Sequence, residues 1–159
     1  MSRDPMAFSD EITFVGTTQL HPLDTRRVEI NATYGRQEWR YVKNNEGATT
    51  LAIGNPCMHS TAQTVAGKVL QATTSVASDR IRGVAQHAIV AGSYGWILRR
   101  GNGLVLADAT GFTADTGLIA DASTAGCAAD TSGVTAASFA FALAANAGST
   151  TAIAYIHCM

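Results

Sequence analysis

The chain has 159 residues, the length of one ordinary domain, and a formal net charge of −1 at pH 7. With 47% apolar residues it can bury a core without a disulfide or a metal, so the composition argues against intrinsic disorder. The balanced charge argues against a generally basic nucleic-acid coat protein.

The charge is unevenly distributed along the chain. Residues 1–100 hold all 11 Lys and Arg and eight of the 12 acidic residues, whereas residues 101–159 hold only four Asp. These are Asp108, Asp115, Asp121 and Asp130. Such a charge-poor stretch is poorly equipped to face water on all sides, which favours extensive contact with other subunits or another protein. The alternative is a small uncharged domain kept soluble by Thr, Ser and Asn.

Neither export nor membrane insertion is predicted. The N-terminus lacks an apolar core of signal-peptide length, and the most apolar part of the C-terminal stretch, residues 134–147, is too short for a span of about 20 residues. We therefore expect synthesis in the cytoplasm. Cys57, Cys127 and Cys158 form no CxxC pair, so we expect buried free thiols and no metal or other cofactor.

Residues 1–25 look irregular and contain one short extended piece at residues 12–15. We interpret them as an N-terminal arm that lies on another surface through Phe8, Ile12 and Phe14. Residues 26–159 are then the β-rich domain. Its first strand, at residues 26–32, places Val28, Ile30 and Ala32 on one face and Arg27, Glu29 and Asn31 on the other, the pattern of a half-buried strand.

Further strands are predicted at residues 38–43, 51–53, 69–74 and 80–90. Residues 61–69 are ambiguous and could form a short helix. Residues 94–99 and 104–106 read as a hairpin around Arg100-Gly101-Asn102-Gly103, because Asn and Gly supply the positive φ that tight turns require.

The tail predicts a second hairpin. Phe139, Phe141 and Leu143 alternate with small residues at period 2, which favours a strand over an Ala-rich helix, and residues 153–157 continue the alternation. We expect the Phe/Leu face to meet the core and the face of Ala142 and Ala144 to mediate self-association. Short strands separated by turns predict an all-β fold, a small barrel or a sandwich of antiparallel strands with the extended arm.

No catalytic motif is present. Gly101-Asn102-Gly103 lacks the last Gly of a dinucleotide fingerprint, and neither a phosphate-binding loop nor HExxH occurs. A hydrolase with a triad assembled from distant His, Asp and Ser is a remote alternative. Tyr94 and Trp96 share a strand face that could stack on bases, but a role in the core or an interface is favoured.

Three segments give the sequence a family resemblance. They read DTRRVEINATYGRQEWRYVKN at residues 24–44, TTLAIGNPCM at 49–58 and GVAQHAIVAGSYGWILRRG at 83–101, and Gly/Ala/Thr-rich strands follow. Together they resemble small virion structural proteins of tailed bacteriophages, the capsid decoration or cement class, over most of residues 13–158.

The resemblance implies a β-rich, non-enzymatic protein that binds the outer surface of an icosahedral head. The implied partners are the major capsid protein and further copies of the chain, most simply a homotrimer, and they include neither nucleic acid nor membrane. Another virion component, such as a head fibre or tail protein, is the alternative. The residues that we expect to contact the capsid or a neighbouring subunit are Phe8, Ile12, Phe14, Arg26, Arg27, Tyr94, Trp96, Arg99, Arg100, Ala142 and Ala144.

Overall fold

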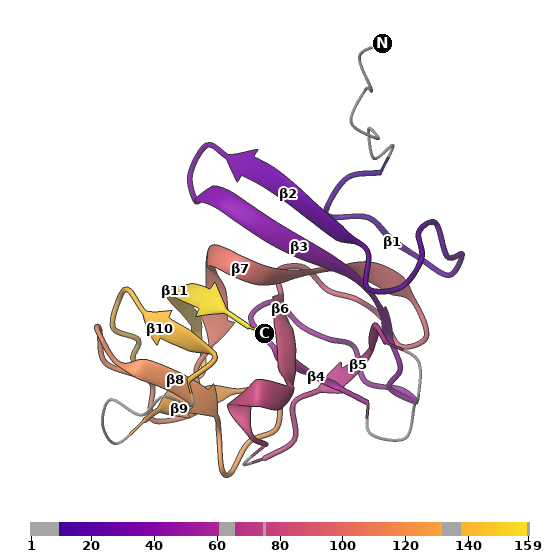
Figure 1. Ribbon diagram of the computed structural model, residues 1–159. Helices are drawn as coiled ribbons and strands as arrows, with labels where there is room; N and C mark the ends of the chain where they lie inside the picture. Colours follow the sequence, from indigo (N-terminus) through magenta and orange to yellow (C-terminus); the bar gives the residue numbers. More distant parts are fainter. Residues whose placement is uncertain (1–9, 61–65, 75, 132–137, 159) are drawn as a thin grey trace.

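A computed structural model describes residues 10–60, 66–74, 76–131 and 138–158 of the chain (Figure 1). Within them the backbone forms one sheet of 11 strands and a single 3-10 turn, Ser78–Arg80, so the all-β prediction is confirmed. The strands are β1 (Val15–Gly16), β2 (Arg26–Asn31), β3 (Gly35–Asn44), β4 (Pro56–His59), β5 (Lys68–Gln71), β6 (Ile81–Ala85), β7 (Tyr94–Leu106), β8 (Gly117–Ala120), β9 (Ala128–Asp130), β10 (Ala140–Ala142) and β11 (Thr151–His157).

Five of the strands pair into a closed ring. The ring runs β3-β5-β4-β6-β7 and returns to β3; the β3–β5 pairing is parallel and the others are antiparallel. Each of these strands contributes one residue to a buried apolar cluster, which Leu51 and Ile89 complete. The five are Val42, Cys57, Val69, Ala85 and Ile97. The ring is barrel-like, but the other strands continue as open sheet, so the molecule is not a clean barrel.

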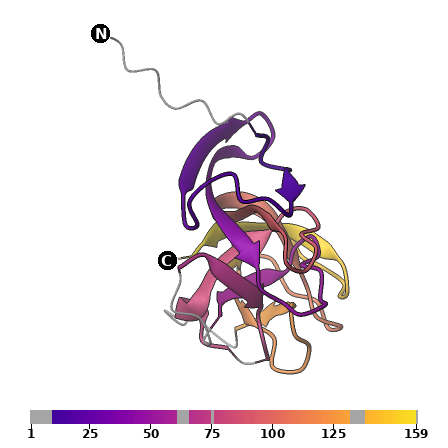
Figure 2. The same ribbon diagram turned by 90° about the vertical axis from the view of Figure 1, so that its right-hand side faces the viewer.

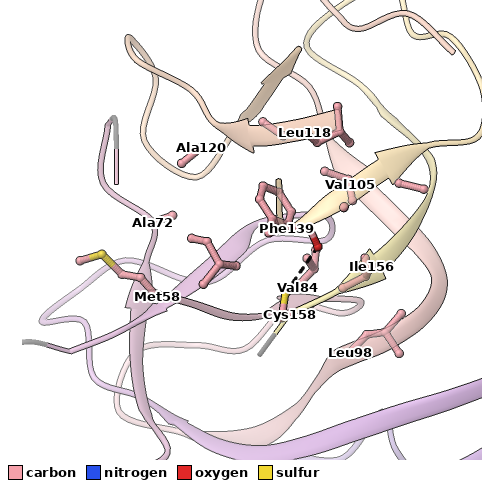
Figure 3. Packing of buried hydrophobic residues seen from close by; sticks show 14 of the residues in the cluster. Met58, Ala72, Val84, Leu98, Val105, Leu118, Ala120, Phe139, Ile156 and Cys158 are labelled. Carbon is pink, nitrogen blue, oxygen red and sulfur yellow. Dashed lines mark hydrogen bonds between the residues drawn. The ribbon is translucent and has the colours of Figure 1, made fainter. Parts of the chain in front are cut away.

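The C-terminal strands form an extension in the order β11-β10-β8-β9, and β11 joins it to β7. A second and larger core lies where this extension packs on the ring (Figure 3). Met58, Val84 and Leu98 come from the ring, whereas Leu118 and Phe139 come from the extension. At the opposite edge of the sheet, β3 is the one described strand that pairs with β2, and the two strands project as a hairpin (Figure 2).

Strand β7 corrects one prediction. Residues 100–103 do not form a turn, because β7 continues through them without a break. Its first half pairs with β3 and its second half with β11, so each half already has a partner. Gly101 lies between the halves with φ +116°, and a Cβ there would approach the Arg36 carbonyl oxygen to 2.6 Å. The residue that suggested a turn therefore bends a continuous strand.

Side chains satisfy the backbone of β7 beyond this bend. The Gln37 amide donates to the Asn102 carbonyl at 2.7 Å. The Gln86 amide donates to the Leu104 carbonyl at 2.9 Å and accepts from the Leu104 N–H at 2.8 Å. These bonds replace the ladder that β3 provides before the bend, so the second half of β7 keeps its backbone partners.

The strand predicted at residues 26–32 is confirmed, but the face assigned to the core was wrong. Val28 is 52% exposed and Ile30 is 78% exposed, whereas Arg27, Glu29 and Asn31 are half-buried. Arg27 faces inward because its guanidinium donates to the Asp10 carbonyl at 2.6 Å. A polar contact with the N-terminal segment therefore sets the orientation of this edge strand.

The tail shows the same reversal. The hairpin of β10 and β11 is confirmed, and Phe139 is buried as expected. However, Ala142 is 1% exposed, whereas Phe141 and Leu143 are 43% and 46% exposed. Phe139 and the side chains from β8 and β11 already fill the core here, so the inner face of β10 accommodates only methyl groups. Residues 61–65 of the possible helix lie outside the described residues, and the rest of that segment leads into β5.

The bend in β7 gives the first prediction. Replacing Gly101 by Ala places a side chain against the Arg36 carbonyl at a positive φ, and we expect a loss of about 1–3 kcal/mol in the free energy of unfolding. Urea unfolding followed by circular dichroism measures it. Gly47→Ala is the matched control, because nothing lies within 4 Å of the added Cβ. Equal midpoints for the two variants would contradict the role of Gly101.

Candidate functional site

The segment before β2 is attached to the sheet through Asp10. One carboxylate oxygen of Asp10 accepts the indole N–H of Trp96 at 2.8 Å, and the other lies 2.6 Å from Nε2 of His21. Trp96 is fully buried and Asp10 is 9% exposed. Residues 10–21 therefore lie on the chain's own β3 and β7, where the sequence suggested an arm lying on another surface.

Aromatic rings surround this attachment. The Tyr41 ring lies 5.1 Å from both the His21 and Trp96 rings and stacks on Tyr94 at 6.1 Å. The Tyr41 hydroxyl accepts the backbone N–H of Leu20 at 3.1 Å. Tyr94 and Trp96 thus do share a face, as predicted, but that face is packed by the chain itself. Trp96 has no surface on which a base could stack.

Burial of Asp10 raises its pKa, but hydrogen bonds from Trp96 and His21 outweigh that effect, and the net pKa is lowered from its ordinary value. The ionised carboxylate is therefore the form that the folded chain prefers. This is a structural charge, held by an indole from β7 and an imidazole from the N-terminal segment.

The other predicted contact residues are dispersed. Phe8 lies outside the described residues. Ile12, Phe14, Arg27, Arg99 and Ala144 are half-buried, Ala142 is buried, and Arg26 and Arg100 are exposed. Arg99 pairs with Glu38 at 3.1 Å, and the Nε of exposed Arg100 donates to the Tyr155 hydroxyl at 3.2 Å. In a single chain, Ala142 and Trp96 are therefore not available to a partner.

An apolar surface lies on the outer side of β10 and β11. Phe141 and Tyr155 are paired in register, and the N–H of Leu143 donates to the Ile153 carbonyl at 3.0 Å. The Phe141 and His157 rings stack at 5.0 Å, and the Tyr155 and His157 rings lie 6.4 Å apart. We call Phe141, Leu143, Ile153, Tyr155 and His157 the aromatic face. It contains no acidic residue and no Lys or Arg.

The sequence pattern located Phe141 and Leu143 but assigned them to the core. Alternation at period 2 separates two faces without stating which is covered. The composition of residues 101–159 was the better guide to the exposed face, because the scarcity of charged residues there indicated an uncharged surface.

A cleft of about 240 Å³ lies between the β2–β3 hairpin, the segment after β6 and β7. Buried Trp39 and half-buried His87 line it, and their Nε1 and Nε2 atoms have no hydrogen-bond partner in the described part of the chain. Burial lowers the pKa of His87, so its imidazole is neutral at pH 7. Among the described residues that line the cleft there is no carboxylate to orient this imidazole as a general base.

The described residues hold no group of three or more His, Cys, Asp or Glu side chains that could bind a metal ion. All three cysteines are free and buried, and burial raises the pKa values of Cys57 and Cys158 to about 12. Those two thiols are protonated at neutral pH. No helix in the described ranges is long and apolar enough to cross a membrane.

The chain is similar in structure to the head fibre gp8.5 N base of bacteriophage phi29, seen in a crystal structure. The two share 11% sequence identity with a TM-score of 0.53. The likeness covers 74% of this chain and 92% of the other, so it shows a shared fold. No family model matches the sequence. No curated protein matches it either.

The attachment through Asp10 gives a prediction about acid stability. A carboxylate with a lowered pKa in the folded chain stabilises the fold above its unfolded pKa of about 3.9, and this stability is lost as the pH falls through the folded value. We expect Asp10→Asn to lower the free energy of unfolding by about 1–3 kcal/mol at pH 7.

The difference between wild type and Asp10→Asn should shrink as the pH is lowered below about 4. Urea unfolding at a series of pH values measures this difference. Because it compares two proteins, the other carboxylates with lowered pKa values, Glu38 and Asp130, cancel from it. A difference that stays constant with pH would contradict the assigned role of the Asp10 charge.

Proposed function

We propose that this chain is a structural protein of a tailed-bacteriophage head that binds the outer surface of the capsid. The observation that carries the proposal is the fold likeness to a head fibre base, which extends over 74% of the chain. The sequence resemblance to virion proteins of the decoration class points to the same particle. The structural likeness comes with only 11% identity, so it concerns the fold and not the sequence.

Two versions of this function differ in what the bound protein does. A decoration protein bridges neighbouring capsid subunits and stabilises the shell, because a ligand that binds only the assembled state lowers the free energy of that state. A head fibre base attaches a projecting structure and has no need to bridge subunits. The structural likeness favours the second version and the sequence resemblance favours the first.

In either version, we infer that copies of the chain associate through the aromatic face. The five side chains of this face are partly exposed and include no Asp, Glu, Lys or Arg. Exposed Arg100 borders the face and donates to the Tyr155 hydroxyl at 3.2 Å, so a contact centred on Phe141 and Leu143 keeps that charge at its rim. Closed symmetry is the common way to cover such a surface, and the sequence resemblance suggests a trimer. The proposal moves the contact from Ala142 and Ala144, as first expected, to Phe141 and Leu143.

Sedimentation with empty, expanded heads of the phage that encodes the chain tests the function. We expect the purified chain to pellet with these heads and to remain in solution without them. Thermal disruption of the heads then separates the versions: a decoration protein raises the disruption temperature in step with occupancy, and a fibre base leaves it unchanged. A chain that stays in solution in the presence of heads would refute both versions.

Self-association is tested with Leu143→Glu. We expect this variant to lower the mass measured by light scattering to that of a monomer while circular dichroism stays unchanged, because Leu143 is exposed. Val90→Glu is the matched control, since Val90 is 51% exposed and lies outside the aromatic face. Ala142→Glu is unsuitable, because it places a charge in the core. A monomeric wild type, free and on the head, would refute the contact.

A further inference from the structure

A positively charged pocket lies where β2 and β3 meet β4 and β6. Its volume is about 220 Å³, and Asp24, Arg26, Arg40, His59 and Arg82 line it. Arg26 comes from β2, Arg40 from β3 and Arg82 from β6, so the fold gathers three guanidinium groups from three strands. Their positions are fixed by sheet pairing rather than by a flexible loop.

The strand register places like charges together. Arg26 and Arg40 are directly opposite each other in the antiparallel β2–β3 pair, an arrangement that is unfavourable for two cations. Asp24 is the acidic residue that lines the pocket, and its Oδ1 lies 3.0 Å from Nε of Arg40. Three arginines and one aspartate leave two formal positive charges in excess around a small volume.

The excess is not neutralised by the described neighbours. Arg26 and Arg82 form no ion pair with any residue in the described ranges, and the buried Nε of Arg82 has no hydrogen-bond partner there. Glu38 is nearby, but it is already engaged with Arg36 and Arg99. Residues 61–65, which precede the pocket-lining segment in the chain, contain no acidic residue.

The excess positive charge affects the pKa of Arg40. Burial lowers its pKa, Asp24 partly opposes this effect, and the neighbouring Arg99, Arg26 and Arg82 lower the pKa further. Arg40 is only 5% exposed, so solvent screens these repulsions less than on an open surface. An anion that enters the pocket relieves the repulsion and gives Arg26 and Arg82 a partner.

We propose that this pocket binds a carboxylate side chain from an acidic segment of the protein on which the chain docks. The inference rests on the proposed function for the identity of that partner, the capsid, but the chemistry is that of the pocket. The planar guanidinium of Arg presents paired N–H donors that match the two oxygens of a carboxylate. Asp24 is the ion-pair partner of Arg40, so the guanidiniums that form no ion pair within the described residues are those of Arg26 and Arg82.

Binding of a short peptide tests the pocket without any capsid. The probe is a peptide of alternating Asp and Gly with blocked ends, and its matched control replaces every Asp by Asn. We expect the acidic peptide to shift the NMR signals of the Arg26 and Arg82 side chains and the Asn peptide to leave them unchanged. Raising the salt concentration should weaken the binding of the acidic peptide, because salt screens the attraction between its carboxylates and the guanidiniums.

Substitutions assign the binding to the pocket. We expect Arg26→Gln and Arg82→Gln each to lower the affinity for the acidic peptide roughly tenfold, the usual effect of losing one charge-assisted hydrogen bond. Arg36→Gln is the charge-matched control, because Arg36 lies on β3 outside the pocket with a side chain that is 60% exposed, and it should change the affinity less than twofold. Circular dichroism verifies that each variant is folded. Arg82→Lys keeps the charge but lacks the paired N–H donors of a guanidinium, so it should bind the acidic peptide with intermediate affinity.

Three outcomes would overturn the proposal. They are equal binding of the Asn peptide, equal weakening by Arg36→Gln, and side-chain shifts caused by inorganic phosphate but not by the acidic peptide. Failure of the proposed function can be told apart from failure of the pocket. If the peptide binds as expected and the heads do not bind the chain, the pocket stands and its assigned partner is wrong. If Arg82→Gln binds the heads as tightly as wild type, the capsid does not use the pocket.

Discussion

The course of β7 is the constraint on which both halves of the fold depend. Its first half closes the five-strand ring against β3 and β6, and its second half carries the C-terminal extension through β11. One strand can serve both because Gly101, at a positive φ, brings the backbone against the Arg36 carbonyl where a side chain would not fit. The ring and the extension are therefore held at a fixed relation, and the larger core fills the space between them.

The composition of the extension follows from this packing. The inner face of β10 accommodates alanine because Phe139, Leu118 and Ile156 occupy the core beside it. Larger apolar residues at alternate positions must then point outward, and the segment carries almost no charge with which to cover them. The aromatic face thus arises because only alanine fits on the inner face of β10, which leaves the larger apolar side chains on the outer face. A free chain exposes it to water, which gives the extension a physical reason to meet a partner.

Sequence reasoning was most successful where the signal is local. Alternation and turn residues predicted the β class, the strand at residues 26–32 and the tail hairpin, because period 2 reports extended backbone directly. It failed where the answer depends on distant residues. The orientation of β2 is set by the hydrogen bond from Arg27 to Asp10. Gly101 lies within a strand and not in a turn because β3 and β11 pair with the two halves of β7. The bond between Asp10 and Trp96 joins residues 86 positions apart, beyond any local pattern.

The arginine pocket and the aromatic face would act on a partner through different physics. An apolar face gains free energy from any surface that excludes water, so it contributes affinity with little selectivity. A fixed cluster of guanidiniums discriminates, because a partner without an acidic group there leaves buried cations unpaired. Both features are built on paired strands, so neither must be ordered on binding. If copies of the chain associate through the aromatic face as proposed, a selective contact of modest strength is sufficient on a particle that presents many identical sites, because the linked copies bind together.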